Sequence, residues 1–399
     1  MKIALLGIGT VGSGVFKVLH TNRALLEQKA GQPLEITHIF TRDPHKDRGF
    51  DTSNIVMTDD IQVIYEADID LAVEVMGGVD FTREVVATLL QKGVSVVTAN
   101  KDMLALHIDE LSQLANAHQA TLLYEASVAG GVPIINGIEV GLAANELTAV
   151  MGILNGTTNY MLTRMTQDGW SYEQALQVAQ EKGYAEVDPT NDVGGFDAAR
   201  KITLLSRLAY QTKVDFNQVA VKGIDQVEAY DIQLAQQAGY IMKLLGKSVK
   251  TADSIQIGVA PVFLPAQHPL AGVSEAMNAV FVEGNAIGQT MFWGPGAGSL
   301  ETASAVVADI IQAAQRGYIA QRIPQAQLPV VQQAAPQAYY VRFTANSKQV
   351  RPILQALEIG YMTLNDEETF VIKTETVAPS VLDYLMQQTT VAAVYPVIG

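Results

Sequence analysis

A glycine-rich turn between an apolar segment and an amphipathic one is the feature that most limits how this chain can fold. The apolar run Lys2–Leu6 predicts a strand, and Val11–Leu26 carries apolar residues at helical spacing. The turn between them has the pattern G-x-G-x-x-G, whose glycines allow a tight turn, close approach of a pyrophosphate and close helix packing. We therefore expect a dinucleotide site here, and a glycine-rich turn without a ligand is the alternative. The cofactor-binding candidates in the turn are Gly7, Gly9, Thr10, Val11 and Gly12.

The first third of the chain alternates strand-like and helix-like segments. Helical stretches near Arg83–Gln91 and Asp102–His118 separate runs that are β-branched or apolar. Such alternation predicts an α/β fold with a parallel, doubly wound sheet. The strand-like runs are Lys2–Leu6, Leu34–Phe40, Leu71–Met76, Val94–Thr98 and Thr121–Glu125.

The end of the second predicted strand bears on which nucleotide is bound. Arg42 stands where an acidic residue would accept hydrogen bonds from a ribose 2′-hydroxyl, and an arginine suits a 2′-phosphate. Asp43 can serve a 2′-hydroxyl or hold Arg42, whereas His45 and Lys46 either add positive charge or belong to a solvated turn. The pattern favours NADP and leaves NAD open.

Composition excludes several classes of protein. The 399 residues include 26 Lys and Arg against 41 Asp and Glu, a net charge of −15, and no basic stripe that would bind nucleic acid or an anionic membrane is present. The absence of cysteine excludes disulfides, a thiolate nucleophile and cysteine-type zinc sites. The N-terminus lacks the long apolar region of a signal peptide, and no run of about 18 apolar residues suggests a membrane span. We expect a cytoplasmic protein of two or three domains.

The pattern changes after about residue 130. Mixed segments predict an α+β domain over 135–302, and an Ala- and Val-rich helix at about 303–320 completes the first domain, 1–134. A linker rich in Pro, Gln and Ala covers 323–337. The remaining residues, 338–399, predict the order β-α-β-β-α-β of a ferredoxin-like module. Its expected elements are Tyr339–Phe343, Val350–Leu357, Gly360–Leu364, Thr369–Lys373, Ser380–Gln388 and Val391–Val397.

A loop that is rich in acids and glycines lies between two predicted helices, from Gly183 to Asp197. Asp197 and Lys201 stand four residues apart, so one face of the following helix presents both. An isolated pair of this kind is an ordinary surface ion pair, worth less than about 0.5 kcal/mol. The density of acids and glycines around it favours a pocket instead.

At this loop the chain resembles the homoserine dehydrogenase family. The spacing of glycines, acids and lysine from Ala179 to Lys201 is similar to the family signature, and the resemblance extends over about residues 1–320. Further landmarks of the family follow in order along the chain. They are the N-terminal glycine turn, Thr98-Ala99-Asn100-Lys101, the segment from Glu125 to Pro133, Asn155-Gly156-Thr157-Thr158-Asn159, and Gly294 to Gly298.

The resemblance implies an enzyme that interconverts L-aspartate 4-semialdehyde and L-homoserine with NAD or NADP, on the branch that leads to threonine, methionine and isoleucine. Lys201 would donate the proton to the aldehyde oxygen and accept it in reverse. Lys101 would be a second basic residue, which orients the aldehyde oxygen or the cofactor or shares the proton transfer. Glu186 and Asp197 would bind the α-ammonium group of the substrate, and Asp192 would orient Lys201 or polar substrate atoms.

The resemblance also implies contacts to the cofactor and to a metal ion. Gly183 would lie at the nicotinamide end, and Gly298, with its neighbour Gly296, would close on the cofactor. Glu125 and three backbone carbonyls resemble the family's monovalent cation site, an all-oxygen set that suits Na⁺; a simple glycine-rich hinge is the alternative. The three carbonyls are those of Val128, Gly130 and Val132.

The resemblance further implies a homodimer or a higher homo-oligomer, with 135–302 as the substrate-binding and dimerisation domain. The segment 338–399 resembles an ACT module, which binds amino acids in many members. However, Phe343 is followed by Thr344-Ala-Asn-Ser-Lys-Gln-Val350 instead of the D-x-x-G-type turn that an ACT module shows. This departure favours dimer contacts over threonine feedback as the role of the module. No amino-acid kinase region is present, as in monofunctional members.

Two other functions stay open at this point. Another oxidoreductase with the same nucleotide-binding fold would show an active-site His or a Tyr-Lys arrangement in place of the acid-rich loop. A non-catalytic nucleotide or amino-acid sensor would keep Gly9 and Gly12 but would not need four further residues together. These are Lys101, Glu186, Asp197 and Lys201.

Overall fold

The computed structural model describes residues 1–325, 327–331 and 335–398, which form two compact units. Unit 1 consists of Met1–Asn145, Thr203–Phe216 and Gly294–Gln327. Unit 2 consists of Glu146–Ile202, Asn217–Trp293 and Leu328–Gly399. Within the described ranges, no helix is both long enough and apolar enough to span a bilayer.

Unit 1 is built on a six-stranded sheet in the order β3-β2-β1-β4-β5-β6. Every pair of neighbours runs parallel, as expected for a doubly wound sheet, and the strand order reverses between β1 and β4. Ligands of such sheets bind at this point of reversal, beyond the carboxyl ends of the strands. The strands are β1 (Lys2–Leu6), β2 (Glu35–Phe40), β3 (Val56–Thr58), β4 (Leu71–Glu74), β5 (Ser95–Thr98) and β6 (Leu122–Leu123).

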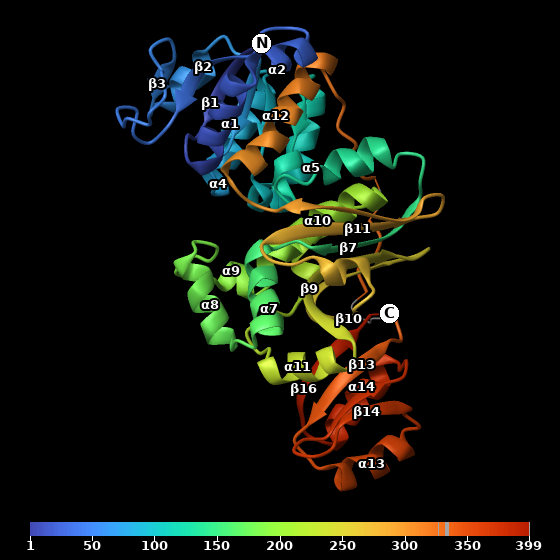
Figure 1. Cartoon of the computed structure of the whole chain (residues 1–399). Coiled ribbons are helices and arrows are strands. Elements are labelled where there is room, and N and C mark those ends of the chain that lie inside the picture. The colour runs from blue at the N-terminus through green and yellow to red at the C-terminus, as the bar shows by residue number, and fades with distance from the viewer. Residues whose placement is uncertain (326, 332–334, 399) are drawn as a thin grey trace. The chain divides into compact units, whose positions relative to one another are not determined.

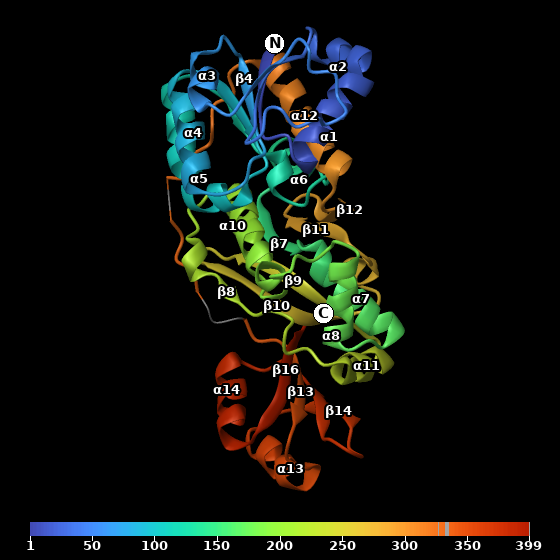
Figure 2. The ribbon, with the colours of Figure 1, turned by 90° about the vertical axis from the view of Figure 1, so that its left-hand side faces the viewer.

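Helices cover both faces of this sheet. Helices α1 and α12 lie side by side on one face although they come from opposite ends of the unit's sequence, and α4 and α5 lie on the other (Figures 1 and 2). Val15 of α1 and Val306 of α12 are fully buried against sheet residues such as Leu5 and Val73. The helices are α1 (Thr10–Thr21), α2 (Arg23–Ala30), α3 (Ile61–Glu66), α4 (Asp80–Gln91), α5 (Lys101–Ala117), η1 (Glu125–Ser127), α6 (Ile134–Asn136), η2 (Gly137–Gly141) and α12 (Ser299–Arg316).

Three predicted element boundaries in unit 1 are wrong. The helix expected over Val11–Leu26 is two helices, because Asn22 leaves the helical conformation at φ −102° and ψ 16°. The helix expected at about 303–320 begins at Ser299 and ends before Gly317, whose φ of +63° favours glycine. The strand expected over Thr121–Glu125 pairs only at Leu122–Leu123, because Glu125 belongs to η1.

Unit 2 is built on a ten-stranded mixed sheet in the order β12-β11-β7-β9-β10-β16-β13-β15-β14, with β8 paired to β10. Its helices are α7 (Gly156–Asp168), α8 (Tyr172–Glu181), α9 (Thr190–Val193), α11 (Ala229–Gln237), α13 (Ser347–Ala356) and α14 (Pro379–Gln388), with η3 (Phe216–Gln218) and η4 (Pro269–Gly272); α10 (Phe196–Tyr210) belongs to both units. The strands are β7 (Leu147–Ile153), β8 (Ala220–Val221), β9 (Tyr240–Lys250), β10 (Ile255–Pro265), β11 (Met277–Gly284), β12 (Gly288–Pro295), β13 (Ala338–Phe343), β14 (Tyr361–Asn365), β15 (Val371–Thr374) and β16 (Val391–Val397).

The last six elements form the ferredoxin-like module expected from the sequence. Their order along the chain is β13-α13-β14-β15-α14-β16, and the strands lie in the order β16-β13-β15-β14 with antiparallel neighbours. Val350 of α13 and Leu385 of α14 pack on Val341 and Ile372 of the sheet. The module shares one sheet with the preceding strands because Phe263 of β10 pairs with Val397 of β16. The domain limits expected from the sequence stay a prediction.

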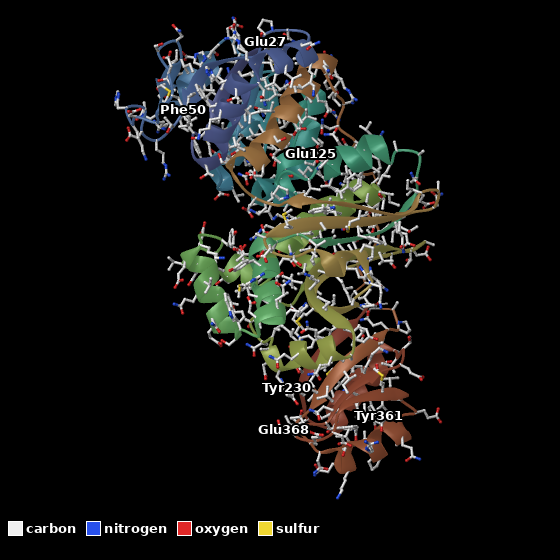
Figure 3. All side chains as sticks on the ribbon, viewed as in Figure 1. Glu27, Phe50, Glu125, Tyr230, Tyr361 and Glu368 are labelled. Atoms are coloured by element: carbon white, nitrogen blue, oxygen red, sulfur yellow. The ribbon has the colours of Figure 1, made fainter. Side chains whose placement is uncertain are left out.

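A buried polar cluster joins helix α11 to this module. Asp231 is fully buried and accepts hydrogen bonds from the Tyr340 hydroxyl (2.7 Å) and from Nε of Arg342 (2.7 Å). Its neighbour Tyr230, labelled in Figure 3, shares a hydrogen bond of 2.8 Å with the hydroxyl of Thr369. Burial raises the pKa of Asp231, so its hydrogen bonds are needed to hold it charged.

Lys243 on β9 is a buried lysine that donates hydrogen bonds to two neutral groups. Its ammonium donates to the side-chain oxygen of Asn159 (3.1 Å) and to the carbonyl of Val273 (2.5 Å), and the residue is 2% exposed. Burial lowers the pKa of Lys243 from 10.5 to about 8, because the charged form is taken out of water.

The burial of Lys243 predicts an unusual dependence of stability on pH. Between pH 8 and pH 10.5 the unfolded chain binds more protons at this site than the folded one, so its stability rises with pH. The Lys243→Met variant lacks this titration. In denaturant unfolding, the free energy of unfolding of wild type should therefore rise by about 3 kcal/mol relative to that of the variant across that range. A difference that stays constant with pH would contradict the assignment.

Candidate active site

The glycine turn after β1 has the geometry that the sequence predicts. Gly7 has a φ of +102°, and its N–H donates to the Phe40 carbonyl at 2.9 Å. A Cβ on Gly12 would lie 2.1 Å from the Gly7 oxygen, so only glycine lets α1 pack against the turn. A Cβ on Gly9, the N-cap residue of α1, would meet nothing within 4 Å, so there is open space beside a helix N-terminus, which favours anions. The turn therefore fits a dinucleotide phosphate.

The start of helix α12 contacts the same turn. Of the residues involved, the sequence predicts a role only for Gly298, which directly precedes the helix. The Ser299 hydroxyl donates to the Thr10 carbonyl at 2.7 Å, directly after Gly298, which has a φ of +136°. A Cβ on Gly14 would lie 2.1 Å from the Ser299 oxygen. Gly14 thus allows the start of α12 to touch α1, and this contact brings the Gly298 segment to the predicted cofactor turn. In the sequence, the only indication of this role of Gly14 is its position two residues after Gly12.

The loop after β2 holds an exposed Arg42 beside a self-bonded turn. One side-chain oxygen of Asp43 accepts the backbone N–H groups of His45 and Lys46, both at 3.1 Å. Arg48 donates to the Thr41 hydroxyl (3.0 Å) and to the Asp43 carbonyl (2.7 Å), which stiffens the loop. Asp43 therefore shapes the turn, and Arg42 is an exposed cation close to the end of β2.

The carboxyl ends of β4 and β5 contain a buried acid that the sequence analysis missed. Glu74 is fully buried, accepts the Thr98 hydroxyl and accepts the Met76 N–H at 2.8 Å. Asn100 caps α5 by accepting the Met103 N–H at 3.1 Å, which fixes the start of the helix. Burial raises the pKa of Glu74. In the sequence, the only indication of a role for Glu74 is its position at the end of the buried strand β4.

The predicted residue Lys101 is the first residue of α5, directly after this network. Its side chain is about one-third exposed, and its ammonium lies 3.7 Å from an Asp102 carboxylate oxygen. Lys101 therefore stands at the carboxyl edge of the unit 1 sheet, where a ligand of that sheet would bind.

In unit 2, Lys201 and Asp197 form a buried ion pair on the first turns of α10. The Lys201 ammonium donates to Asp197 and to the Leu154 carbonyl, both at 2.7 Å, and the two residues are 9% and 6% exposed. Asn278 of β11 donates to the same carbonyl at 3.0 Å. Groups at the ends of β7 and β11 therefore hold the Lys201 ammonium in position, whereas a surface ion pair would have no such support.

Asn155 connects this pair to Asp192. Its side-chain nitrogen donates to Asp192 at 2.7 Å and to Asp197 at 2.9 Å. Its side-chain oxygen accepts the Thr158 N–H at 2.9 Å and so caps α7. Burial raises the pKa of Asp192, and the Asp197 carboxylate adds to the rise. Sequence reasoning quoted Asn155 only as a landmark, because its contacts join segments that are far apart in the chain.

The structure does not bring every predicted residue to this cluster. Glu186 is exposed, and its backbone carbonyl accepts a hydrogen bond from the Gln180 side chain at 3.1 Å. Gly183 is exposed after α8 with a φ of +73°. The cluster in unit 2 thus unites Lys201, Asp197 and Asp192, while Lys101 belongs to unit 1.

Glu125, labelled in Figure 3, lies in the interior of unit 1 and holds the start of α6. Its two oxygens accept the N–H groups of Ile135 and Asn136, both at 2.8 Å, and the Asn136 side-chain nitrogen at 2.6 Å. The pKa of Glu125 is raised by burial, and Asp309 has its pKa raised by burial and by Glu125. A Cβ on Gly130 would lie 2.3 Å from the Gly296 carbonyl oxygen, so the curled segment after Glu125 needs a glycine.

Comparisons with known proteins agree on one family. A family model for homoserine dehydrogenase matches residues 133–311, and a model for the NAD-binding domain of homoserine dehydrogenase matches residues 7–125. The homoserine dehydrogenase of Bacillus subtilis is 43% identical over 78% of this chain and 72% of its own. That of Pseudomonas aeruginosa is 35% identical over 92% of this chain and 88% of its own.

Solved structures give the same result. A homoserine dehydrogenase from Thiobacillus denitrificans superposes with a TM-score of 0.93 at 32% identity, covering 100% of this chain and 98% of its own. A hyperthermophilic archaeal homoserine dehydrogenase in complex with NADPH superposes with a TM-score of 0.67 at 26% identity, over 80% of this chain and 99% of its own.

Variants of Gly9 in the first turn of unit 1, and of Gly12 and Gly14 in helix α1, should separate folding from nucleotide binding. Gly12→Ala and Gly14→Ala each place a Cβ 2.1 Å from a backbone oxygen and should lower the free energy of unfolding by about 2 kcal/mol or more. Gly9→Ala meets no atom and should leave stability unchanged while weakening dinucleotide binding. Denaturant unfolding and calorimetric titration measure the two effects. Equal stability losses in all three variants would contradict this division.

Proposed function

The chain belongs to the homoserine dehydrogenase family, and we propose from that premise that Lys201 transfers the proton when L-aspartate 4-semialdehyde and L-homoserine interconvert. The buried contact of Lys201 with Asp197 and the Leu154 carbonyl carries the proposal. It leaves one proton of the ammonium free to reach a substrate oxygen, because an ammonium has three donors. A simple surface ion pair would leave the group in water.

The chemistry follows from this geometry. A bound nicotinamide supplies hydride to the aldehyde carbon in the reducing direction and takes it back in reverse. Lys201 stabilises the negative charge that develops on the aldehyde oxygen and gives it a proton. Asp197 keeps the ammonium in one orientation, since its carboxylate lies 2.7 Å from the lysine nitrogen. Lys101 orients the aldehyde oxygen or the cofactor, or shares the proton transfer.

The acids divide their roles by their contacts. Asp197 is occupied by Lys201 and Asn155, so it acts chiefly as the positioning group for the lysine. Asp192 accepts a hydrogen bond from Asn155 and would bind the substrate's α-ammonium or orient polar substrate atoms. Glu186 binds the same ammonium from its exposed loop, and Gly183 lies at the nicotinamide end. The sequence predicts that Asp197 binds the substrate and that Asp192 orients Lys201, and this assignment exchanges those two roles.

Removal of the lysine tests the proposal most simply. Lys201→Met should lower kcat for NADP-dependent homoserine oxidation by about 100- to 10,000-fold while the protein stays folded. The matched control is Lys250→Met, which removes a lysine from a surface pair with Glu146 and should keep wild-type kcat. If Lys201→Met turns over at the wild-type rate, the proposed mechanism is wrong. If wild type oxidises no homoserine with either nucleotide, the activity itself is wrong.

We propose NADP as the preferred nucleotide, with NAD accepted more weakly. Arg42 is exposed directly after β2, and Asp43 is occupied by its own turn. The glycine turn, Thr10, Val11 and the Gly298 segment hold the phosphates and close on the cofactor. The archaeal relative whose structure is described as a complex with NADPH supports the same preference.

The Arg42→Ala variant tests the nucleotide preference. Loss of a charge-assisted contact to a 2′-phosphate should raise the KM for NADP about tenfold or more and leave the KM for NAD within about twofold. Steady-state assays with both nucleotides on the same preparation measure this ratio. Equal changes for the two nucleotides would refute the assignment of Arg42.

We also propose that Glu125 and the carbonyl oxygens of Val128, Gly130 and Val132 hold a monovalent cation, Na⁺ by ligand type. Hydrogen bonds from the start of α6 fix both oxygens of Glu125, and a carboxylate held in this way is a hard oxygen ligand. Glu125, Glu139 and Asp309 lie close enough to affect one another's pKa values, which burial already raises. A cation would offset this buried negative charge.

A homodimer is the proposed assembly. Strand β12 lies at one edge of the unit 2 sheet, and Trp293 on it is 61% exposed. An exposed edge strand with a large apolar side chain favours pairing with a second copy. The proposal includes the branch of amino-acid synthesis towards threonine, methionine and isoleucine, which follows from the resemblance, and the cytoplasmic location that the sequence predicts. The alternative functions, another oxidoreductase or a non-catalytic sensor, are not favoured.

A further inference from the structure

A cavity of about 710 Å³ lies in unit 2, away from the Lys201 cluster. Strands β8, β9 and β10 form one wall, and the ends of β13, β15 and β16 reach it from the ferredoxin-like module. The volume is in the range of pockets that hold small organic ligands. None of the residues that the proposed reaction uses lines it.

Three lysines line this cavity: Lys222, Lys247 and Lys373. Lys247 pairs with Gly258 of β10, and Gly258 pairs with Ala220 of β8. Paired residues point their side chains to the same face, as do residues two apart along a strand. Lys247 and Lys222 therefore rise from one face of the sheet, with the side-chain-free Gly258 between their strands.

The lysines have little negative charge to balance them. Among the described residues that line the cavity there is no Asp or Glu. Lys222 donates to the Val394 carbonyl at 3.2 Å and lies over the Tyr395 ring, both uncharged partners. Burial lowers the pKa of Lys247 and of Lys222, and only Asp225 acts on Lys222 in the opposite direction. Half-buried cations of this kind are stabilised by an anion.

The rest of the wall is mostly aliphatic and includes Leu245, Val259 and Val397. A polyphosphate would leave this surface without a partner, whereas an aliphatic body would cover it. A free α-amino acid would bring an ammonium group that finds no carboxylate among the described lining residues.

We propose that this cavity binds a small organic carboxylate with an aliphatic body, whose carboxylate is held by Lys247, Lys373 and Lys222. The ligand would contact both the catalytic sheet and the ferredoxin-like module. The proposal does not depend on the proposed reaction, because binding can be measured without cofactor or substrate.

Calorimetric titration of the full chain with three matched probes tests the proposal. Hexanoate carries the carboxylate and the aliphatic body, hexanamide lacks the charge, and norleucine adds an α-ammonium to the hexanoate skeleton. We expect saturable binding of hexanoate, at least about tenfold weaker binding of norleucine, and none of hexanamide. Each methylene removed on going to butyrate should weaken binding about fourfold.

Lysine variants locate the site. Lys247→Gln and Lys373→Gln should each weaken hexanoate binding about tenfold or more, whereas Lys348→Gln, on the exposed side of α13, should bind as wild type does. Melting temperatures of the variants show whether each is folded, and the double variant Lys222→Gln with Lys247→Gln provides a second test if one is not.

Several results would overturn the proposal. Absence of hexanoate binding, equal binding of hexanoate and hexanamide, or unchanged binding in both lysine variants would each do so. Inorganic phosphate that binds as tightly as hexanoate would show simple attraction of anions without a role for the aliphatic wall. If the lysine variants instead shift the protein from dimer to monomer without any effect of the carboxylate, the cavity belongs to a contact between copies.

Discussion

The buried ion pair between Lys201 and Asp197 is the interaction on which the proposed chemistry of unit 2 depends. Breaking a buried pair leaves an uncompensated charge and costs several kcal/mol, so the surrounding groups must keep both partners in place. The Leu154 carbonyl at the end of β7, the Asn155 amide beside it and Asn278 on β11 together do this. The ends of two strands and the first turns of α10 therefore fix the position of the Lys201 ammonium, the group that the proposal makes the proton donor.

In unit 1, the packing of α1 and α12 at the predicted cofactor turn depends on close backbone contacts rather than on charge. Gly12 lets α1 approach the first turn, and Gly14 lets the start of α12 approach α1. The polypeptide returns after Trp293 to add α12 to the sheet's face, and the Ser299 hydroxyl bonds to the predicted cofactor turn. This return couples the Gly298 segment to the first turn through one short hydrogen bond, which joins two segments that lie 289 residues apart in the sequence.

The sequence predicts the architecture well where the pattern is local. Strand–helix alternation predicts the parallel sheet of unit 1, and the six elements after residue 337 lie within a few residues of their expected positions. The sequence predicts fewer features correctly where contacts between distant segments determine the structure. Asn22 divides a helix that the apolar spacing shows as continuous, and strands β9 to β12 are not identified individually. Lys201, Asp197 and Asp192 are predicted as site residues through the resemblance, whereas Asn155, Glu74 and Gly14 gain their roles only from contacts with distant segments.

The role of Asn155 as the bridge between Asp192 and Asp197 tests the account most directly. Asn155→Ser keeps an N-cap for α7 but removes both amide donors, so it separates positioning from folding. The account predicts that kcat for homoserine oxidation falls about tenfold or more while the free energy of unfolding changes by less than about 1 kcal/mol. Wild-type kcat and KM in a folded Asn155→Ser variant would contradict it.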